Sequence, residues 1–332
     1  MGKVLRMPAE WERHERTLVA WPARAAAWRG TTIEDARDVH AEIVDAIAAF
    51  EPVTLVANPP DADDARARVT ATNVDVVALP IDDSWLRDSG PIIVRGAQDA
   101  RAGIDFRFNA WGEAFTPYDR DADIARRLLE HLGIERSASP LVLEGGSIAV
   151  DGQGTLVTTE QCLLNPNRNP LLSRDEIARE LQQQLGADTI VWLENGLVED
   201  ADTDGHVDNV CAFLAPGHAL LQTVRDPDDP NHDNARRNRE ILDRAGVAVV
   251  ELDLLPRTVR DDGAAVAIPY TNFYLCNGAA IVPVAQIDPD MDRQALDLLA
   301  TLMPGREIVG VPGRVLALGG GGVHCITQQV PE

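Results

Sequence analysis

Apolar residues recur along most of the chain at spacings that alternate between those of helices and those of strands. Between residues 32 and 50 they stand three to four positions apart, which predicts a helix with Thr32 as its N-cap. Further helices are predicted at 61–69, 121–132, 174–185, 231–245 and 290–301. Short runs of mostly valine, isoleucine, leucine and alanine predict strands at 17–22, 52–57, 74–79, 141–150, 156–159, 189–193, 219–222, 248–252, 279–284 and 307–310. The alternation predicts an α/β protein, and no linker or low-complexity segment divides it.

Four polar stretches interrupt this regular pattern. They are DDSWLRDSGP at 82–91, LEGGS at 143–147, DTDGHVDN at 202–209 and LGGGGVHCITQQ at 318–329. Each stretch sets ionisable or nucleophilic groups beside glycine, proline or tryptophan, and loops on a rigid scaffold commonly carry function. An acidic turn or a tight glycine turn would have the same composition, so each stretch alone also has a purely structural interpretation.

The last of these stretches places four consecutive glycines shortly before Cys325. Glycine lets the backbone bend sharply and lets other groups approach closely. A nucleophilic thiolate needs access and exposed backbone N–H groups nearby, which such a loop supplies. The alternative is a buried structural cysteine.

The stretch at 202–209 has a useful period. If it is extended, the side chains of Asp204, His206 and Asp208 share one face. A histidine flanked by carboxylates can act as an acid or a base. Such a group could also ligate zinc, but the other histidines supply no second cluster. A solvated acidic loop is the structural alternative.

Composition excludes several classes of function. The chain has 332 residues with 30 Lys+Arg against 53 Asp+Glu, a net charge of −23, which argues against nucleic acid and anionic membrane surfaces as partners. No signal peptide is evident, and no apolar run approaches the ~18 residues of a membrane helix. The cysteines form no CxxC pair, as expected of free thiols in a reducing compartment, and we expect a cytoplasmic protein. They are Cys162, Cys211, Cys276 and Cys325.

One thiol, one histidine and several carboxylates together suggest covalent catalysis on a cationic, electrophilic carbon. A guanidinium fits this description because it is planar, permanently charged and gripped bidentately by carboxylates. Peptide hydrolysis would also use Cys and His, but it requires an oxyanion hole rather than paired carboxylates. No G-x-S-x-G, P-loop or dinucleotide-binding motif is present.

Motifs in these stretches and elsewhere resemble those of the agmatine deiminases, within the guanidino-group-modifying (pentein) superfamily and related to bacterial peptidyl-arginine deiminase-type proteins. The resemblance runs almost end to end, and its specificity lies in the order of its parts. These are MPAEW at 7–11, WLRDSGP at 85–91, NAWG at 109–112, LEGGSI at 143–148, LLNPNRNP at 163–170, TDGHVDN at 203–209, NFY at 272–274 and the segment 319–329.

The resemblance implies a five-bladed α/β propeller of ββαβ units around a substrate channel, formed by a single domain over residues 1–332. It implies that Cys325 is the nucleophile and His206 the general acid and base. It also implies that Asp88 and Asp208 clasp the guanidinium and that Glu144 supports the histidine. We expect no metal or organic cofactor. We expect the protein to form a homodimer or a higher homo-oligomer.

The substrate expected from the resemblance is agmatine, which would be converted to N-carbamoylputrescine and ammonia, a step of polyamine biosynthesis. Agmatine is preferred over arginine because acids outnumber cations in these motifs, so an ammonium is accepted more readily than a carboxylate. Side chains expected to contact the substrate are Asp204, Trp85 and Trp111.

Other outcomes of the same chemistry stay open. They are a deiminase for another guanidine, including arginine, an amidinotransferase, and a non-enzymatic protein that binds polyamines or guanidines. The identity of the guanidino substrate stays open because the chain departs from the family pattern at four positions beside the motifs. At these positions the family commonly has, in the order given next, His, Gly, Asn and Ile. The departures are Ala149, Glu113, Gly322 and Val323.

Overall fold

The structure is a computed structural model that describes residues 5–96 and 100–332. The chain divides into two compact units. Unit 1 consists of Met1–Glu12, Asp88–Asp253 and Pro331, and unit 2 consists of Arg13–Arg87, Leu254–Val330 and Glu332. This division does not test whether the chain folds as one domain, so the single domain over 1–332 stays a prediction.

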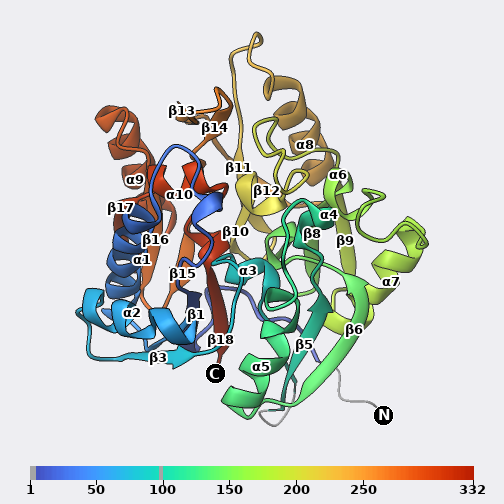
Figure 1. Cartoon of the computed structure of the whole chain (residues 1–332). Coiled ribbons are helices and arrows are strands. Elements are labelled where there is room, and N and C mark those ends of the chain that lie inside the picture. The colour runs from blue at the N-terminus through green and yellow to red at the C-terminus, as the bar shows by residue number, and fades with distance from the viewer. Residues whose placement is uncertain (1–4, 97–99) are drawn as a thin grey trace. The chain divides into compact units, whose positions relative to one another are not determined.

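Unit 1 contains three sheets of three strands, built to one plan (Figure 1). In each sheet the first two strands are antiparallel, and the third joins the second in parallel after a helix. The strands are β4 (Ile92–Arg95), β5 (Arg101–Arg107) and β6 (Arg136–Val142), then β7 (Ile148–Val150), β8 (Thr155–Thr159) and β9 (Thr189–Leu193), then β10 (Cys211–Ala215), β11 (His218–Gln222) and β12 (Ala248–Leu252). The connecting helices are α5 (Ile124–Leu132), α7 (Arg174–Leu185) and α8 (His232–Arg244).

Helix α7 shows how the sequence sets these boundaries. The Ser173 side chain accepts from the backbone N–H of Glu176, and the Glu176 side chain accepts from the backbone N–H of Ser173, which is a capping box. Gly186 ends the helix in the left-handed conformation at φ 67°. The apolar face of α7, with Ile177 and Leu181, packs into a core with Leu141 and other side chains of the first two sheets.

Unit 2 contains a four-stranded sheet, a three-stranded sheet and a hairpin. The strands are β1 (His14–Ala20), β2 (Val53–Ala57), β3 (Val74–Ala78), β13 (Arg257–Val259), β14 (Ala265–Ala267), β15 (Tyr274–Cys276), β16 (Ala279–Val284), β17 (Glu307–Pro312) and β18 (Thr327–Pro331). The sheets have the orders β18-β1-β2-β3 and β15-β16-β17, so strands from the two ends of the chain are neighbours. The sheet β15-β16-β17 repeats the plan of unit 1.

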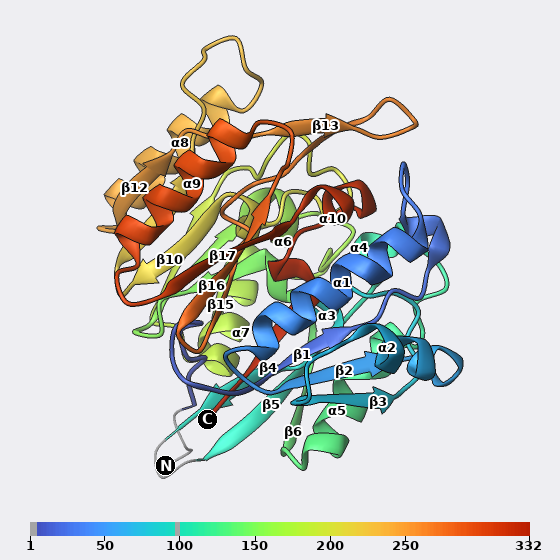
Figure 2. The ribbon, with the colours of Figure 1, turned by 90° about the vertical axis from the view of Figure 1, so that its left-hand side faces the viewer.

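Helices of unit 2 cover its sheets (Figure 2). Helix α1 packs against β2, β16 and β17, and α9 packs against β17. The helices are α1 (Ile33–Ala48), α2 (Ala62–Arg68), α9 (Pro289–Leu302) and α10 (Arg314–Gly319). None of the helices in the described part of the chain has the length and apolar character that crossing a bilayer requires.

Short helical turns precede several first strands. They are α3 (Leu86–Ser89), η5 (Gly145–Ser147), η6 (Val207–Asn209) and η7 (His324–Ile326), and each lies directly or closely before β4, β7, β10 or β18. The remaining short helices are η1 (Ala25–Ala27), η2 (Pro59–Asp61), α4 (Ala110–Glu113), η4 (Asp121–Asp123) and α6 (Glu160–Leu163).

The structure confirms the predicted long helices and most of the predicted strands. The continuous strand predicted at 141–150 is wrong, because β6 ends at Val142 and β7 begins at Ile148. Between them the chain turns through Gly145–Ser147, so the glycines mark a break rather than a kink in one strand.

Candidate functional site

The predicted site residues of unit 1 lie just before the first strand of successive sheets. Asp88 precedes β4, Glu144 precedes β7, and His206 and Asp208 precede β10. All four side chains are buried. Because the three sheets share one plan, equivalent turns present residues from distant parts of the sequence to one place.

The side chains of Asp88, His206 and Asp208 all lie close to Gly146. A Cβ atom built on Gly146 would lie 2.6 Å from His206 Nδ1, 2.9 Å from Asp88 Oδ1 and 3.0 Å from Asp208 Oδ2. The backbone N–H of Gly146 also donates to Asp88 Oδ1 at 2.9 Å. Any side chain here would displace the histidine or a carboxylate, so close approach explains the glycine.

His206 lies between two carboxyl groups. Its Nδ1 is 3.9 Å from Asp88 Oδ1, and its Nε2 is 3.9 Å from Glu144 Oε2. Among residues 5–96 and 100–332, neither buried ring nitrogen has a hydrogen-bond partner. Burial alone lowers the pKa of His206, but the charge of Asp88 and the adjacent Cys162 and Glu144 raise it well above its ordinary value. The surrounding acidic groups therefore favour the protonated imidazole.

Asp88 is held by two donors. Trp111 Nε1 donates to its Oδ2 at 2.9 Å, and the Gly146 N–H donates to its Oδ1. Burial raises the pKa of Asp88 to about 6, with contributions from Asp208 and Glu144, while His206 opposes the shift. A second cation placed here would reverse the effect of the neighbouring carboxylates.

Glu144 is paired with Arg168, for which the sequence alone indicates no function. Both side chains are fully buried, and Arg168 Nε donates to Glu144 Oε1 at 2.7 Å. Burial raises the pKa of Glu144, but His206 and Arg168 outweigh it and hold that pKa below its ordinary value. Glu144 is therefore an ionised carboxylate beside the histidine.

The segment 202–209 is not extended, so the condition for a common face of Asp204, His206 and Asp208 is not met. Asp204 has φ 61° and Gly205 φ 81°, and Val207–Asn209 form a 3-10 turn. The alternation argument for a common face therefore fails, although His206 and Asp208 still meet at Gly146. The Asp204 carboxylate accepts from Arg168 at 2.7 Å and from Asn167 at 2.8 Å, and a quarter of the side chain is exposed.

Trp111 sits in a strained turn next to the carboxylates. Its φ of 56° lies in the left-handed region, which a tryptophan rarely adopts. Edge-on packing against Phe108 and Phe115, with ring centroids 5.2 Å and 5.5 Å away, fixes the indole, whose N–H reaches Asp88.

The cysteine loop belongs to unit 2. Cys325 lies in η7, and Asn272 Nδ2 is 3.4 Å from its Sγ. A Cβ atom on Gly321 would lie 2.5 Å from the Trp85 ring, and one on Gly322 would lie 2.3 Å from Asn272 Oδ1. Two of the four glycines are thus required by close packing beside Cys325.

Two residues that the sequence leaves without a role hold this loop. Asn272 precedes β15, at the position that Cys325 has before β18, and its Oδ1 accepts from the His324 N–H at 3.0 Å. Arg87 is buried, and it donates to the His324 carbonyl at 3.2 Å and to Gln329 Oε1 at 2.7 Å. Asn272 lies in the NFY motif and Arg87 in the WLRDSGP motif, so these motifs were the sequence features that could have indicated the two residues.

The other cysteines are poor candidates for a nucleophile. All are buried and free. Burial raises the pKa of Cys211 and that of Cys276 to about 12, and burial together with Glu144 raises the pKa of Cys162. A thiolate is therefore disfavoured at these three positions.

One group in unit 1 has the composition of a metal site. The ligand atoms of Glu144, Cys162 and His206 lie within 4.8 Å of one another. Binding a metal would have to remove protons from both Cys162 and His206, and the Arg168 cation already pairs with Glu144. These features disfavour a metal, and we assign none.

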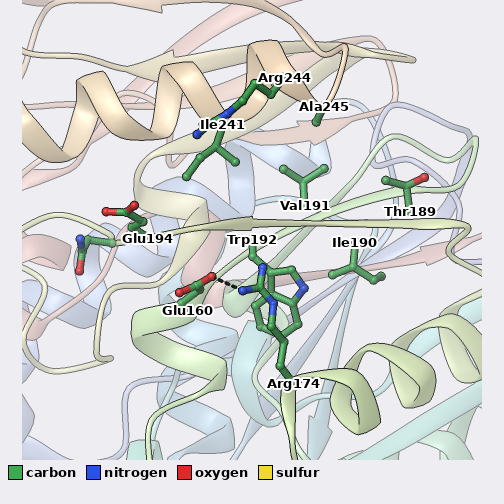
Figure 3. Close-up of a pocket in the computed structure, with 11 residues that line it drawn as sticks. Glu160, Arg174, Thr189, Ile190, Val191, Trp192, Glu194, Ile241, Arg244 and Ala245 are labelled. Carbon is green, nitrogen blue, oxygen red and sulfur yellow. Dashed lines mark hydrogen bonds and ion pairs between the residues drawn. The ribbon is translucent and has the colours of Figure 1, made fainter.

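A separate surface groove of about 660 Å³ lies in unit 1 and contains none of the predicted site residues (Figure 3). Arg174 stacks on Trp192 with its guanidinium carbon 5.0 Å from the ring centroid, and it pairs with Glu160 at 2.6 Å. Arg174 and Glu160 are thus already paired with each other. The groove is lined by Glu160, Arg174, Thr189, Ile190, Val191, Trp192, Glu194, Asn195, Ile241, Arg244 and Ala245.

Comparisons with known proteins cover the whole chain. The family model described as Porphyromonas-type peptidyl-arginine deiminase matches residues 6–331. An agmatine deiminase of Pseudomonas aeruginosa (strain UCBPP-PA14) is 42% identical over 98% of this chain and 95% of its own length. A putative agmatine deiminase of Legionella pneumophila (strain Philadelphia 1) is 40% identical over 98% of this chain and 94% of its own.

Solved structures agree with the sequences. The agmatine deiminase of Enterococcus faecalis superposes with a TM-score of 0.93 at 32% identity, over 99% of this chain and 96% of that one. The C. jejuni agmatine deiminase with substrate bound gives a TM-score of 0.91 at 27% identity over the same shares. These matches confirm the predicted fold class, an α/β propeller of the pentein type.

Proposed function

We propose that this chain, which belongs to the Porphyromonas-type peptidyl-arginine deiminase family, is an agmatine deiminase. In this reaction the guanidinium of agmatine is hydrolysed to give N-carbamoylputrescine and ammonia. The observation that carries the proposal is the convergence of Asp88, Asp208 and His206 on Gly146, in a chain about 40% identical over its length to agmatine deiminases. The reaction places the enzyme among hydrolases of C–N bonds in linear amidines and serves polyamine biosynthesis.

The carboxylates suit a guanidinium. Asp88 and Asp208 approach one point from two segments, so two buried carboxylates present acceptors to the same place. A planar guanidinium supplies several N–H donors and a permanent charge to such a pair. In this proposal Asp88 and Asp208 bind the substrate, and Trp111, which donates to Asp88, and Trp85, which lies beside the cysteine loop, border it.

The proposed reaction has two stages. The Cys325 thiolate attacks the central carbon of the guanidinium, and protonated His206 gives its proton to the departing ammonia, leaving a thiouronium on Cys325. His206 then takes a proton from water, whose oxygen attacks the same carbon. Collapse of this adduct breaks the C–S bond and restores the thiolate, and the ureido product leaves after its hydroxyl proton passes to solvent. The raised pKa of His206 supports its role as the first acid.

Agmatine is the preferred substrate in this proposal because, among the described residues of unit 1, Asp204 is a partly exposed acid near the site, whereas Arg168 is committed to other groups. Arg168 is fully buried and donates to four oxygen atoms, so its charge is already committed. Asp204 is partly exposed and is the candidate partner for the substrate's ammonium. The carboxylate of free arginine would meet like charge there.

A product assay tests the function. The purified protein is incubated with agmatine, free arginine and a peptidyl-arginine substrate, with and without added amines, and ammonia and products are measured. Ammonia and N-carbamoylputrescine from agmatine, with much less from the other two, support the proposal. Amidine transfer to an amine without ammonia would establish a transferase, and equal kcat/KM for arginine would remove the assigned specificity.

The cellular setting is part of the same proposal. We propose a single cooperative domain that assembles as a homodimer or larger homo-oligomer and works in the cytoplasm. The four cysteines form no disulfide in the described part of the chain, which supports a reducing compartment. Light scattering on the purified protein gives the assembly, and a monomer across micromolar concentrations would contradict it.

A further inference from the structure

Arg168 belongs to the LLNPNRNP motif, to which the proposed chemistry gives no task. Its guanidinium is fully buried in unit 1. It donates to Glu144 Oε1 at 2.7 Å, to Asp204 Oδ2 at 2.7 Å, to Asn167 Oδ1 at 2.6 Å and to the Thr203 carbonyl at 3.0 Å. Acceptors from three segments of the chain therefore fix the position of this charge.

Glu144 presents its two oxygens to different neighbours. Oε1 accepts from Arg168, while Oε2 is 3.9 Å from His206 Nε2 and 4.0 Å from Cys162 Sγ. Arg168 thus binds one oxygen of the carboxylate and leaves the other for the histidine. A planar guanidinium held by its other donors restricts rotation of the carboxylate, which a solvated cation would not do.

We propose that Arg168 is a positioning residue for the deiminase reaction, which keeps Glu144 ionised and turned toward His206, with Asp204 anchoring Arg168. This proposal rests on the proposed function. Arg168 acts through Glu144 and is not assigned any contact with the substrate.

The charges around Glu144 set the sign of the expected effect. Arg168 and His206 face it and favour the carboxylate, whereas burial and the carboxyl of Asp88 oppose it. His206 in turn faces Asp88 and Cys162, and Asp200 and Asp208 lie near it. Without Arg168, burial is opposed by His206 alone, so Glu144 takes up a proton at higher pH.

The first experiment is the pH profile of kcat/KM for agmatine. Arg168→Met should lower kcat/KM and raise the pKa of Glu144 by about 1–3 pH units, the usual effect of removing an adjacent opposite charge. The acidic limb, on which Asp88 with its pKa of about 6 also titrates, should then become steeper and move to higher pH. Arg168→Lys keeps the charge, so its limb should stay near that of the wild type although kcat falls. Arg174→Met is the matched control, since Arg174 also pairs with a glutamate in unit 1, and its profile should not change.

A double-mutant cycle with Glu144→Gln separates positioning from general support of the fold. If Arg168 acts through Glu144, Arg168→Met should change the acidic limb of the wild type but not that of Glu144→Gln. The same shift in both backgrounds would overturn the proposal, and so would an unmoved limb in Arg168→Met. If Arg168→Met does not fold, an Arg168→Lys limb displaced by a full pH unit or more would overturn it.

The pH dependence of the free energy of unfolding tests the role of Arg168 independently of catalysis. If the wild type releases no ammonia, that result refutes only the proposed function, and this test of Arg168 still applies. The lowered pKa of Glu144 stabilises the folded protein above its unfolded pKa, and this is lost as pH falls through the folded pKa. The stability loss of Arg168→Met should therefore shrink as pH falls, and it should be smaller and nearly constant in Glu144→Gln. A loss that is equal at every pH in both backgrounds would refute the electrostatic role.

Discussion

Single side chains divide the proposed chemistry between a thiol and a set of carboxylates. The nucleophile assigned to Cys325 differs from the other cysteines in its surroundings. Asn272 lies 3.4 Å from its sulfur, and the packed glycines 321 and 322 surround it. The other three thiols have raised pKa values because they are buried. Cys325 is buried as well, so the feature that distinguishes it is the Asn272 amide donor beside its sulfur, which favours a thiolate.

Replacement of Cys325 tests this assignment. Cys325→Ala should lower kcat by at least about 10⁴-fold, because the covalent step is removed. Cys211→Ala and Cys276→Ala should retain kcat and lose about 0.5–3 kcal/mol of stability, as is usual for core substitutions. Mass spectrometry of quenched wild-type enzyme should place an amidino adduct on the peptide that contains Cys325. An adduct elsewhere would contradict the mechanism.

We expect Asp88 to bind the substrate but not to stabilise the substrate-free protein. Asp88→Asn should lower kcat/KM for agmatine by roughly 10²–10³-fold, because a buried charge-assisted pair with the guanidinium is lost. Burial raises the pKa of Asp88 to about 6, so its ionisation does not favour folding at pH 7. The melting temperature at pH 7 should therefore be equal to or higher than that of the wild type. A large drop would show that Asp88 is mainly structural.

At the scale of elements, the repeated ββαβ plan places the candidate residues of each unit in equivalent turns. The turns before β4, β7 and β10 carry Asp88, Glu144 and the His206–Asp208 pair, and the turns before β15 and β18 carry Asn272 and Cys325. The first strands of three residues, such as β7 and β15, are too short to show a hydrophobic period. This explains why the sequence pattern does not predict β15. Strands β4, β10 and β18, of four or five residues, are also not predicted, and each closely follows a polar motif.

Gly146 tests the geometry of the turn before β7. Gly146→Ala would place a methyl group 2.6 Å from His206 Nδ1 and should lower kcat/KM by about 10²-fold or more. Gly133→Ala is the control, because Gly133 has φ 66° and open space around its Cβ position. Its strain should cost about 1 kcal/mol of stability and leave kcat unchanged. Equal kinetics in the two variants would show that Gly146 does not set the spacing of the site.

For the molecule as a whole, substrate binding should be linked to proton release. A bound guanidinium favours ionised Asp88, whose pKa is raised to about 6. In the Cys325→Ala protein, the affinity for agmatine should therefore be nearly constant above that pH and fall about tenfold per pH unit below it. Calorimetry in two buffers of different ionisation enthalpy would also detect proton release near pH 6. Adding Asp88→Asn should weaken binding and flatten its pH dependence, and an unchanged slope would assign the proton to another group.

The sequence by itself determined the α/β class, the long helices, and the motifs that carry Cys325, His206, Asp88, Asp208 and Glu144. These features are local: helical periodicity, N-caps such as Thr32, and glycines beside reactive residues are all visible over a few positions. The tertiary structure decided the rest. It brought Asp88, His206 and Asp208 to Gly146, made Arg168 the partner of Glu144, and turned Asp204 out of the extended conformation. Distances between residues far apart in sequence depend on the packing of whole sheets, which no short pattern encodes.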